Sequence, residues 1–374
     1  MIYKEFFLSL IVLCLSFSIT AQTENEQIKV TINNYIEGTS YNQLDQIAEA
    51  FYPEAELFLD INDEMVVVPI SEYISWFENN KPGEFNGRVG RIISIDQFQN
   101  VATAKAEILM PKSKSRFIDF FILKKIEGKW KIISKTASKK ESNKTGDRIL
   151  FVASNATFYG NSDIATGNSF SEIVNAYHVL DQAGYTIDFV SPIGGTVPLA
   201  YINTSEEQEK SYLYDKDFMY ALEYTLSPEQ VDPNLYRAIY YVGGGSAMFG
   251  VPENEAIQKI AMKIYEENNG IISSVCHGTA GIVNLKTKEG NYLVEGKAVN
   301  GYPDSYENQD ADYFQQFPFL IQKTIEDRGG NFKFSERRTP HVEVTGRLIT
   351  GQNHLSSTLV ADKIIETLEQ IQKQ

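Results

Sequence analysis

The chain has 374 residues, enough for about two domains, and carries 49 acidic against 34 basic side chains, a formal charge of −15. So acidic a chain repels phosphate backbones, and we expect no nucleic acid among its partners. Only two cysteines are present, Cys14 and Cys276.

The first residues are typical of a secretory signal peptide. Lys4 precedes an apolar run over residues 6–19 that is too short for a comfortable membrane span. We predict a signal peptide at residues 1–21, with a retained membrane anchor as the alternative. Because cleavage also removes Cys14, the exported protein would keep one thiol and could form no internal disulfide. We expect it in the periplasm or outside the cell, with no membrane span.

Residues 22–140 are predicted to form an α+β domain, with helices first and a curled antiparallel sheet after them. Helical patterns cover 28–38, 42–52 and 71–80, and strand-like runs cover 55–60, 64–70, 88–99, 101–110 and 115–137, the last divided by a turn at "IEGK". The basic segment 111–117 fits a solvated hairpin better than a binding patch.

This order of elements resembles the cone-shaped SnoaL-like fold, also called nuclear-transport-factor-2-like or lumazine-binding-like. The ending "GKWKIISK" is similar to the closing strands of that fold. Its members range from enzymes to dimerisation and ligand-binding modules. No histidine precedes His178, and no catalytic carboxylate can be identified, so the resemblance implies a binding or pairing role here.

A polar linker is predicted at residues 141–146, and residues 147–374 then alternate strands with helices. Buried strands are expected within 148–154, 186–192, 238–245, 270–275, 298–302 and 347–353, with helices over 169–184 and 254–269. This alternation predicts an α/β domain whose parallel sheet is covered on both faces. Chemistry in such sheets gathers at the carboxyl ends of the strands. The glycine run "GGGSAMFG" does not match a dinucleotide-binding spacing.

The stretch "GIISSVCHGTAGIVNL" places Cys276 between a predicted strand and a predicted helix at 279–285. Ser274 and Gly278 lie two positions to either side, as a sharp nucleophile elbow requires. The start of a helix favours negative charge, so we expect the thiol to ionise easily. A buried, inert cysteine is the alternative.

A thiolate nucleophile also needs donors for the oxygen that becomes negative on attack. The backbone N–H of His277 is one candidate, because it follows the nucleophile. The glycine run supplies the others, Gly244 and Gly245, since no side chain blocks the approach to their backbone. A tight turn at the strand exit is an equally good interpretation of that run.

Residues 146–370 resemble the ThiJ/PfpI superfamily, which has a flavodoxin-like, class I glutamine amidotransferase-like sandwich. The similarity is carried by "SVCHGTAGIVNLKTKEGNYLVEGKAVNGY" and by matching segments before and after it. The branch concerned contains glutathione-independent glyoxalase III enzymes and stress chaperones. The resemblance implies that Glu172 lies beside Cys276 and acts with it and with His277. Asp304 and Glu307 are the candidates for the acid that orients His277.

The chain departs from this family at the pocket. Gly245 stands where the family has a histidine, and His354 stands where proline is usual. Asn168 and Ser169 replace aromatic residues. We therefore expect an altered pocket mouth, while His178 is expected to pack against the sheet.

The leading hypothesis is an exported, glyoxalase III-like lyase that converts small 2-oxoaldehydes to 2-hydroxy acids through a hemithioacetal on Cys276. An amidase or peptidase using the same Cys–His site is one alternative. A non-catalytic chaperone or redox-sensing binding protein is another. The scattered histidines offer no metal-ligand spacing, so we expect no metal and no organic cofactor. We also expect the protein to bind a small carbonyl substrate and to form a homodimer.

Overall fold

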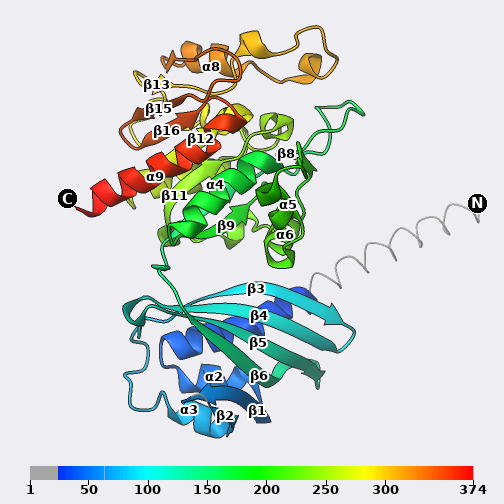
Figure 1. The fold of residues 1–374 in the computed structure, drawn as a ribbon, viewed down its shortest axis with the longest axis vertical. Helices are drawn as coiled ribbons and strands as arrows, with labels where there is room; N and C mark the ends of the chain where they lie inside the picture. Colours follow the sequence, from blue (N-terminus) through cyan, green and yellow to red (C-terminus); the bar gives the residue numbers. More distant parts are fainter. Residues whose placement is uncertain (1–23, 63, 374) are drawn as a thin grey trace, which may run out of the picture. The chain divides into compact units, whose positions relative to one another are not determined.

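The computed structural model describes residues 24–62 and 64–373 of the chain. They divide into two compact units that separate between Lys144 and Thr145 (Figure 1). The predicted signal peptide, residues 1–21, lies outside the described residues. Within the described part of the chain, every helix is too short or too polar to cross a bilayer.

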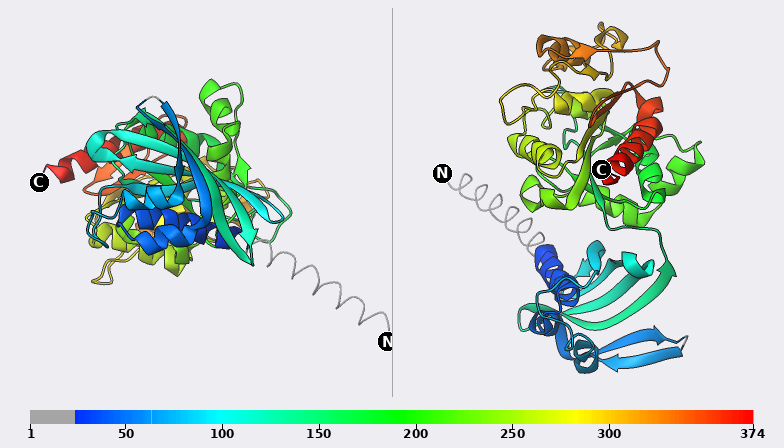
Figure 2. Two further views of the ribbon diagram at one scale, coloured as in Figure 1. Left: turned by 90° about the horizontal axis from the view of Figure 1, so that it is seen from below. Right: turned by 90° about the vertical axis from the view of Figure 1, so that its left-hand side faces the viewer.

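The N-terminal unit begins with helical residues 24–40. Their buried apolar side chains are Ile28, Ile32, Tyr35 and Ile36, a spacing that puts them on one helical face. Two short helices follow, α2 (Leu44–Ala50) and α3 (Ile70–Ser75). The right-hand view of Figure 2 shows the sheet of this unit bending beside these helices.

The sheet of this unit has the order β2-β1-β6-β5-β4-β3. Its strands are β1 (Phe51–Ile61), β2 (Glu64–Pro69), β3 (Val89–Phe98), β4 (Val101–Met110), β5 (Ser115–Ile126) and β6 (Lys129–Glu141). The predicted α+β order is confirmed, and the basic segment forms the β4–β5 hairpin with a short 3₁₀ turn, Pro111–Ser113. The sheet is not wholly antiparallel, because β1 and β6 run parallel. Two parallel strands need a long crossover between them, and the chain from the end of β1 to the start of β6 is long enough to provide one.

A buried carboxylate ties three strands of this sheet together. Glu107 on β4 accepts from Arg91 on β3 at 2.8 Å and from Arg116 on β5 at 2.5 Å. Burial alone would raise the pKa of Glu107, but the charges of Arg91, Lys144 and Arg116 lower it to about 2. The ionised carboxylate therefore stabilises this unit at neutral pH.

The C-terminal unit is built on a second six-stranded sheet, ordered β15-β16-β12-β11-β7-β9. Its strands are β7 (Arg148–Val152), β9 (Thr186–Val190), β11 (Tyr236–Tyr241), β12 (Ile271–Val275), β15 (Val342–Thr345) and β16 (Leu348–Gly351). All neighbours are parallel except β15 and β16. The predicted parallel sheet is confirmed.

Four two-residue strands lie outside this sheet. β8 (Asn168–Ser169) pairs with β10 (Leu199–Ala200), and β13 (Ala298–Val299) pairs with β14 (Asn331–Phe332). The strand expected within 298–302 is therefore present, but it is short and lies outside the main sheet. After Val299 the backbone turns away, and the N–H of Tyr302 donates to the carbonyl of Cys276 at 3.2 Å.

Helices cover both faces of this sheet, as predicted (Figures 1 and 2). One apolar core lies under α4 (Phe170–Gln182), α5 (Glu207–Leu213), α6 (Lys216–Glu223) and α9 (Ser357–Gln372). The other lies under α7 (Glu255–Glu266) and α8 (Ile321–Asp327). Short 3₁₀ turns occupy Pro228–Gln230, Pro233–Leu235, Gly245–Met248, Cys276–Ile282, Asp304–Tyr306, Phe314–Gln316 and His354–Ser356.

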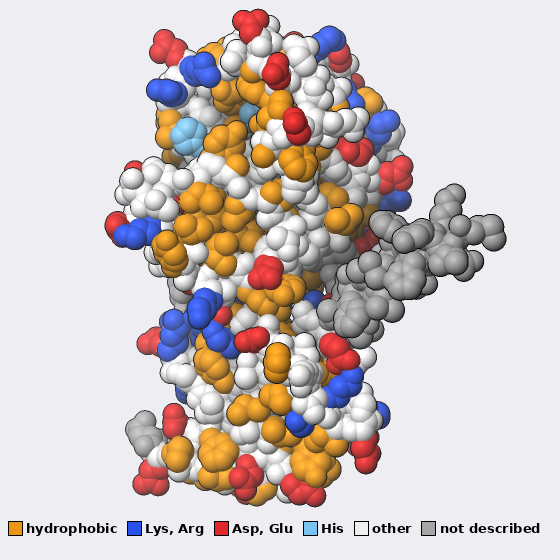
Figure 3. Space-filling model, turned by 90° about the vertical axis from the view of Figure 1, so that its right-hand side faces the viewer, with side chains coloured by type: hydrophobic (Ala, Val, Ile, Leu, Met, Phe, Trp, Pro, Cys, Tyr) orange, Lys and Arg blue, Asp and Glu red, His pale blue; other side chains and the backbone are white. Residues whose placement is uncertain are grey.

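The surface mixes charges of both signs. On the face drawn in Figure 3, acidic and basic side chains alternate with apolar ones over both units.

Candidate functional site

Cys276 lies at a strained turn directly after β12. Its φ is +55°, a left-handed conformation that is rare for a residue with a side chain. The turn needs Gly278, because a Cβ there would lie 2.3 Å from the backbone carbonyl oxygen of Tyr241. The sharp elbow at the end of a central strand thus follows from close backbone packing.

The segment after the elbow is not the α-helix that the sequence predicted. Cys276–Ile282 forms a 3₁₀ helix. Gly281 packs against the ring of Tyr241, where a Cβ would lie 2.3 Å from the ring carbon Cδ1.

Glu172, in the first turn of α4, lies beside the sulfur. Its carboxyl interacts with the Cys276 thiol, the Gly243 backbone N–H and the Ser169 side chain. A Cβ at position 243 would lie 2.2 Å from the carboxyl oxygen Oε2 and 2.9 Å from the Cβ of Cys276. Burial dominates the electrostatics and raises the pKa of Glu172 to about 8.

The thiol is less acidic than the sequence predicted. Burial, followed by the charge of Glu172, raises the pKa of Cys276 well above its ordinary value, and the backbone N–H of His277 only partly opposes this. Cys276 is 7% exposed. The expectation of an easily ionised thiol was therefore wrong, because the elbow is buried, the following helix is a short 3₁₀ turn, and the nearest charged group is an acid.

His277 lies on the other side of the sulfur and is held by an acid. Its Nδ1 is 3.4 Å from the Cys276 sulfur, and its Nε2 is 2.7 Å from Glu307 Oε1. Because a carboxylate can only accept, Nε2 carries the proton and Nδ1 is left as an acceptor facing the thiol. Tyr313 donates to the other oxygen of Glu307 at 3.0 Å, and Tyr302 stacks on the imidazole.

Of the two candidate orienting acids, the structure brings only Glu307 to His277. Asp304 instead accepts from the N–H groups of Gln322 and Lys323, both at 3.0 Å. Asp304 therefore caps the first turn of α8, which needs acceptors for its free N–H groups. The interpretation of Asp304 as an orienting acid was wrong.

The glycine loop lies against the same cavity. Gly244 has a φ of +100°, and a Cβ there would lie 2.4 Å from the backbone oxygen of Gly167. At Gly245 a Cβ would lie 2.2 Å from the hydroxyl of Tyr159. No larger side chain fits at position 245, because Tyr159 fills the space. The third expected donor, the N–H of His277, donates to the sulfur of Cys276.

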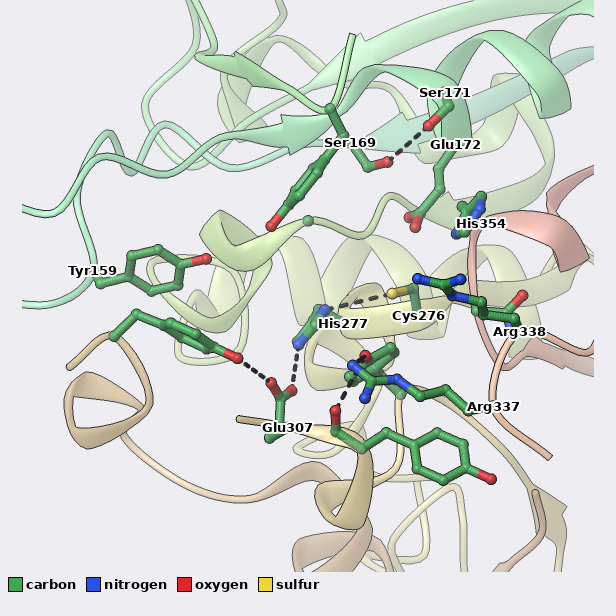
Figure 4. A pocket seen from close by; sticks show the side chains of 16 residues that line it. Tyr159, Ser169, Ser171, Glu172, Cys276, His277, Glu307, Arg337, Arg338 and His354 are labelled. Carbon is green, nitrogen blue, oxygen red and sulfur yellow. Dashed lines mark hydrogen bonds and ion pairs between the residues drawn. The ribbon is translucent and has the colours of Figure 1, made fainter. Parts of the chain in front are cut away.

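These groups open into one cavity of about 550 Å³ (Figure 4). Its lining residues are Tyr159, Ser169, Ser171, Glu172, Tyr201, Gly244, Cys276, His277, Tyr302, Tyr306, Glu307, Tyr313, Arg337, Arg338, Asn353 and His354. Sequence reasoning missed the five tyrosines and both arginines. A pair of adjacent arginines within an acidic domain was the available signal.

Of the remaining residues that differ from the family pattern, one has a structural role and two line the cavity. Asn168 is fully buried and bonds to the backbone of Ser154 and Pro198, so it holds the loop before α4. Ser169 and His354 line the cavity. Burial lowers the pKa of His354. His178 bonds to Tyr212 of α5 at 3.1 Å and lies outside the cavity lining.

Within the described residues, no three or more His, Cys, Asp or Glu side chains are grouped so as to hold a metal ion. The free thiol described is that of Cys276. The chemistry available at the site is therefore that of a buried thiol between a carboxyl group and an imidazole.

Two family models match the chain, one for each unit. Residues 23–138 match the family described as "Putative lumazine-binding", and residues 164–367 match the DJ-1/PfpI family. The N-terminal unit is thus a lumazine-binding-like, SnoaL-like (NTF2-like) domain. The predicted resemblance of the two units to these two families is confirmed.

Curated relatives and a solved structure match the C-terminal unit. Glyoxalase 3 of Candida albicans is 30% identical over 233 residues, 59% of this chain and 97% of the relative. Glutathione-independent glyoxalase hsp3101 of Schizosaccharomyces pombe is 26% identical over 246 residues, 60% of this chain and 98% of the relative. Rapid Encystment Protein 24 kDa of Francisella tularensis superposes with a TM-score of 0.56 at 26% identity, covering 59% of this chain and 99% of that one.

Proposed function

The chain belongs to the DJ-1/PfpI family, and we propose that it is a cysteine-dependent glyoxalase that converts small 2-oxoaldehydes to 2-hydroxy acids without glutathione. The observation that carries the proposal is the position of the Cys276 sulfur, buried between Glu172 and the His277–Glu307 pair at one cavity. Two relatives that match the C-terminal unit are named glyoxalases.

The reaction begins with addition of the sulfur to the aldehyde carbon. The thiol proton passes to Glu172 or to Nδ1 of His277, and a carbon–sulfur bond forms. The same proton then returns to the former aldehyde oxygen to give a hemithioacetal. Burial favours the neutral form of Glu172, so the carboxyl group is stabilised once it has accepted this proton.

A proton then moves between the two substrate carbons. A basic group removes the hydrogen on the former aldehyde carbon, and the adjacent ketone oxygen takes up a proton to give an enediol. Protonation of the second carbon, with loss of the hydroxyl proton from the first carbon, leaves a thioester on Cys276 next to a new hydroxyl group. The first carbon is oxidised and the second reduced, so no external redox partner is required.

Water finally hydrolyses the thioester and releases the 2-hydroxy acid. Nδ1 of His277 can accept a proton from the attacking water, because Glu307 holds the opposite ring nitrogen. The overall balance is one 2-oxoaldehyde plus one water giving one 2-hydroxy acid.

The test is turnover of methylglyoxal to lactate by the purified protein without glutathione, followed by enzymatic assay of the acid. Cys276→Ala is expected to abolish turnover. Ser205→Ala, in an exposed loop outside the cavity, is the matched control and is expected to retain it. Unchanged activity in Cys276→Ala would reject the proposal.

An amidase or peptidase remains the second candidate because the Cys276–His277–Glu307 alignment is also that of a cysteine hydrolase. Release of amine from small amides or peptides, with no acid formed from 2-oxoaldehydes, would favour it. A redox-sensing role is not favoured, since a buried thiol of raised pKa resists oxidation.

Location and assembly complete the proposal. The N-terminal segment supports export, and a fusion that follows reporter activity outside the cytoplasm would test it. We propose a homodimer with the SnoaL-like unit in a binding or pairing role. Light scattering of the whole protein would give the mass that decides this point.

A further inference from the structure

The cavity is larger than its smallest substrate needs, and it carries positive charge at its exposed end. A volume of about 550 Å³ is in the range that holds ligands much larger than a three-carbon aldehyde. Cys276 is nearly buried, whereas Arg337 and Arg338 are exposed and line the same cavity. Figure 4 shows both arginine side chains reaching into the cavity from the same side.

The backbone presents this arginine pair in a strained turn. The N–H of Thr339 donates to the carbonyl of Glu336 at 3.1 Å, which closes a β-turn with the two arginines in the middle. Arg338 has a φ of +64°, a position where glycine or asparagine is preferred. A side chain kept in a costly backbone conformation points to a use for it at that place.

Neither arginine has an acidic partner, although the chain has an excess of acidic residues. Arg337 bonds to the hydroxyl of Tyr302 at 3.4 Å. Arg338 lies near His354, and its charge helps to lower the pKa of that imidazole. Among the described residues neither guanidinium forms an ion pair with a carboxylate. Arginine is well suited to hold a carboxylate or phosphate with two parallel hydrogen bonds.

The carboxyl groups that line the cavity do not cancel these charges. The pKa of Glu172 is raised to about 8 by burial, so it is mostly uncharged at neutral pH. Glu307 is engaged by His277 and by Tyr313 and offsets at most one of the two arginine charges. The net charge of the cavity lining is therefore positive.

Resting on the proposed function, we propose that the preferred substrates are 2-oxoaldehydes with a carboxylate or phosphate at the far end, held by Arg337 and Arg338. The aldehyde reaches Cys276 while the anionic end stays at the exposed arginines. Such a substrate undergoes the same balanced reaction. For 4,5-dioxopentanoate and water the product is 2-hydroxyglutarate, with the aldehyde carbon oxidised and the ketone carbon reduced.

The experiment compares kcat/KM for 4,5-dioxopentanoate and for 2-oxopentanal, which has the same carbon skeleton without the carboxylate. We expect a preference of about 10- to 100-fold for the charged substrate, the range of a hydrogen-bonded ion pair. The Arg337→Gln/Arg338→Gln double variant should lose this preference, mainly through a higher KM for 4,5-dioxopentanoate. Added salt should reduce the preference in the wild-type protein.

Lys333→Gln is the matched control, because Lys333 is an exposed cation after β14 that lies outside the cavity lining. It should leave the preference unchanged. Equal kcat/KM for the two substrates, or a preference that survives in the double variant, would overturn the inference.

A binding measurement separates this inference from the proposed function. Calorimetry on the Cys276→Ala protein compares 2-hydroxyglutarate with 2-hydroxypentanoate, and tighter binding of the former should depend on the arginines. Absence of turnover on every 2-oxoaldehyde would reject the proposed function. Equal binding of the two acids would reject the anion site.

Discussion

Glu172 and Cys276 both hold their protons more firmly than the same groups do in water. Burial is the main cause for each, and for the thiol the carboxylate charge adds to it. Two like charges cannot form easily so close together in a dry site, so the pair gives up its second proton with much more difficulty than its first. The catalytic state we propose is the one from which a single proton has left.

This predicts a particular pH profile. Because the pKa of Glu172 is about 8, the carboxylate that takes up the thiol proton is scarce at pH 6 and common at pH 9. We expect kcat/KM for methylglyoxal to rise with pH through an apparent pKa near 8. Glu172→Gln should lower kcat/KM by about 10²- to 10⁴-fold, the usual contribution of a general base.

Initial rates from pH 5.5 to 9.5 measure both effects, with non-enzymatic loss of substrate subtracted. The inflection near pH 8 should disappear in the glutamine variant. If that variant kept the wild-type profile, Glu172 would not be the group that accepts the proton.

A second prediction concerns the two acids that the sequence could not separate. Glu307→Gln removes the charge that holds Nε2 of His277, and we expect kcat/KM to fall by at least about 10-fold, mainly in kcat. Asp304→Asn weakens the cap of α8 and should instead lower stability by about 1 kcal/mol with activity retained. Kinetics and thermal melts on both variants measure the difference. The reverse pattern would contradict the assignment.

Among the secondary-structure elements, the elbow after β12 depends on residues that lack side chains. Gly243, at the exit of β11, leaves room for the Glu172 carboxyl and for the backbone of the elbow. Such close approaches are what fix the distance between the acid on α4 and the sulfur on the turn. Small displacements there matter, because moving a catalytic group by about 1 Å can lower the reaction rate about 100-fold.

Gly243→Ala is therefore expected to lower kcat/KM by about 100-fold or more, because its Cβ would lie 2.2 Å from Glu172 Oε2. The control is Gly346→Ala, at a turn with φ of +63° and open space around it. That variant should cost about 1 kcal/mol of stability and leave the rate unchanged. Activity and melting temperature of the two proteins check this. Similar rates in both would argue that Glu172 need not occupy its present position.

The regular elements could be predicted from the sequence because their apolar spacing is local. Short apolar runs predicted the strands before and after α4, and Ser274 and Gly278 predicted the elbow. The 3₁₀ winding after Cys276 could not be predicted, because the residue pattern of Cys276–Ile282 does not separate a 3₁₀ helix from an α-helix. The raised thiol pKa also depends on tertiary burial.

The cavity lining was the least predictable part. Its tyrosines and arginines lie mostly in irregular segments with no hydrophobic period to locate them. Asp304 and Glu307 are separated by only three positions, and a short 3₁₀ turn decides which of them faces His277. A sequence can propose both acids, but the choice depends on the fold of distant chain segments.

In the whole molecule, the contributions of Glu107 and Glu172 to the stability of their units change with pH in opposite directions. In the N-terminal unit, Glu107 has a folded pKa near 2, below its ordinary 4.5. Its stabilisation, on the order of 3 kcal/mol, is present above pH 4.5 and is lost as the pH falls toward 2. In the C-terminal unit, Glu172 has a folded pKa near 8. That unit is most stable below pH 4.5 in this respect and loses on the order of 5 kcal/mol as the pH rises to 8.

Calorimetry should therefore resolve two unfolding transitions that move apart or together with pH. Between pH 5 and pH 8 the C-terminal transition should fall by several degrees in the wild type and by less in Glu172→Gln. Between pH 5 and pH 3 the N-terminal transition should fall, and Glu107→Gln should remove most of that dependence. A single transition with one common pH dependence would show that the units do not unfold independently.

The depth of the sulfur has a further consequence for selectivity among electrophiles. Because Cys276 is only 7% exposed, we expect a small aldehyde to reach the sulfur more readily than the disulfide of another protein does. This burial should slow the formation of mixed disulfides at the free thiol.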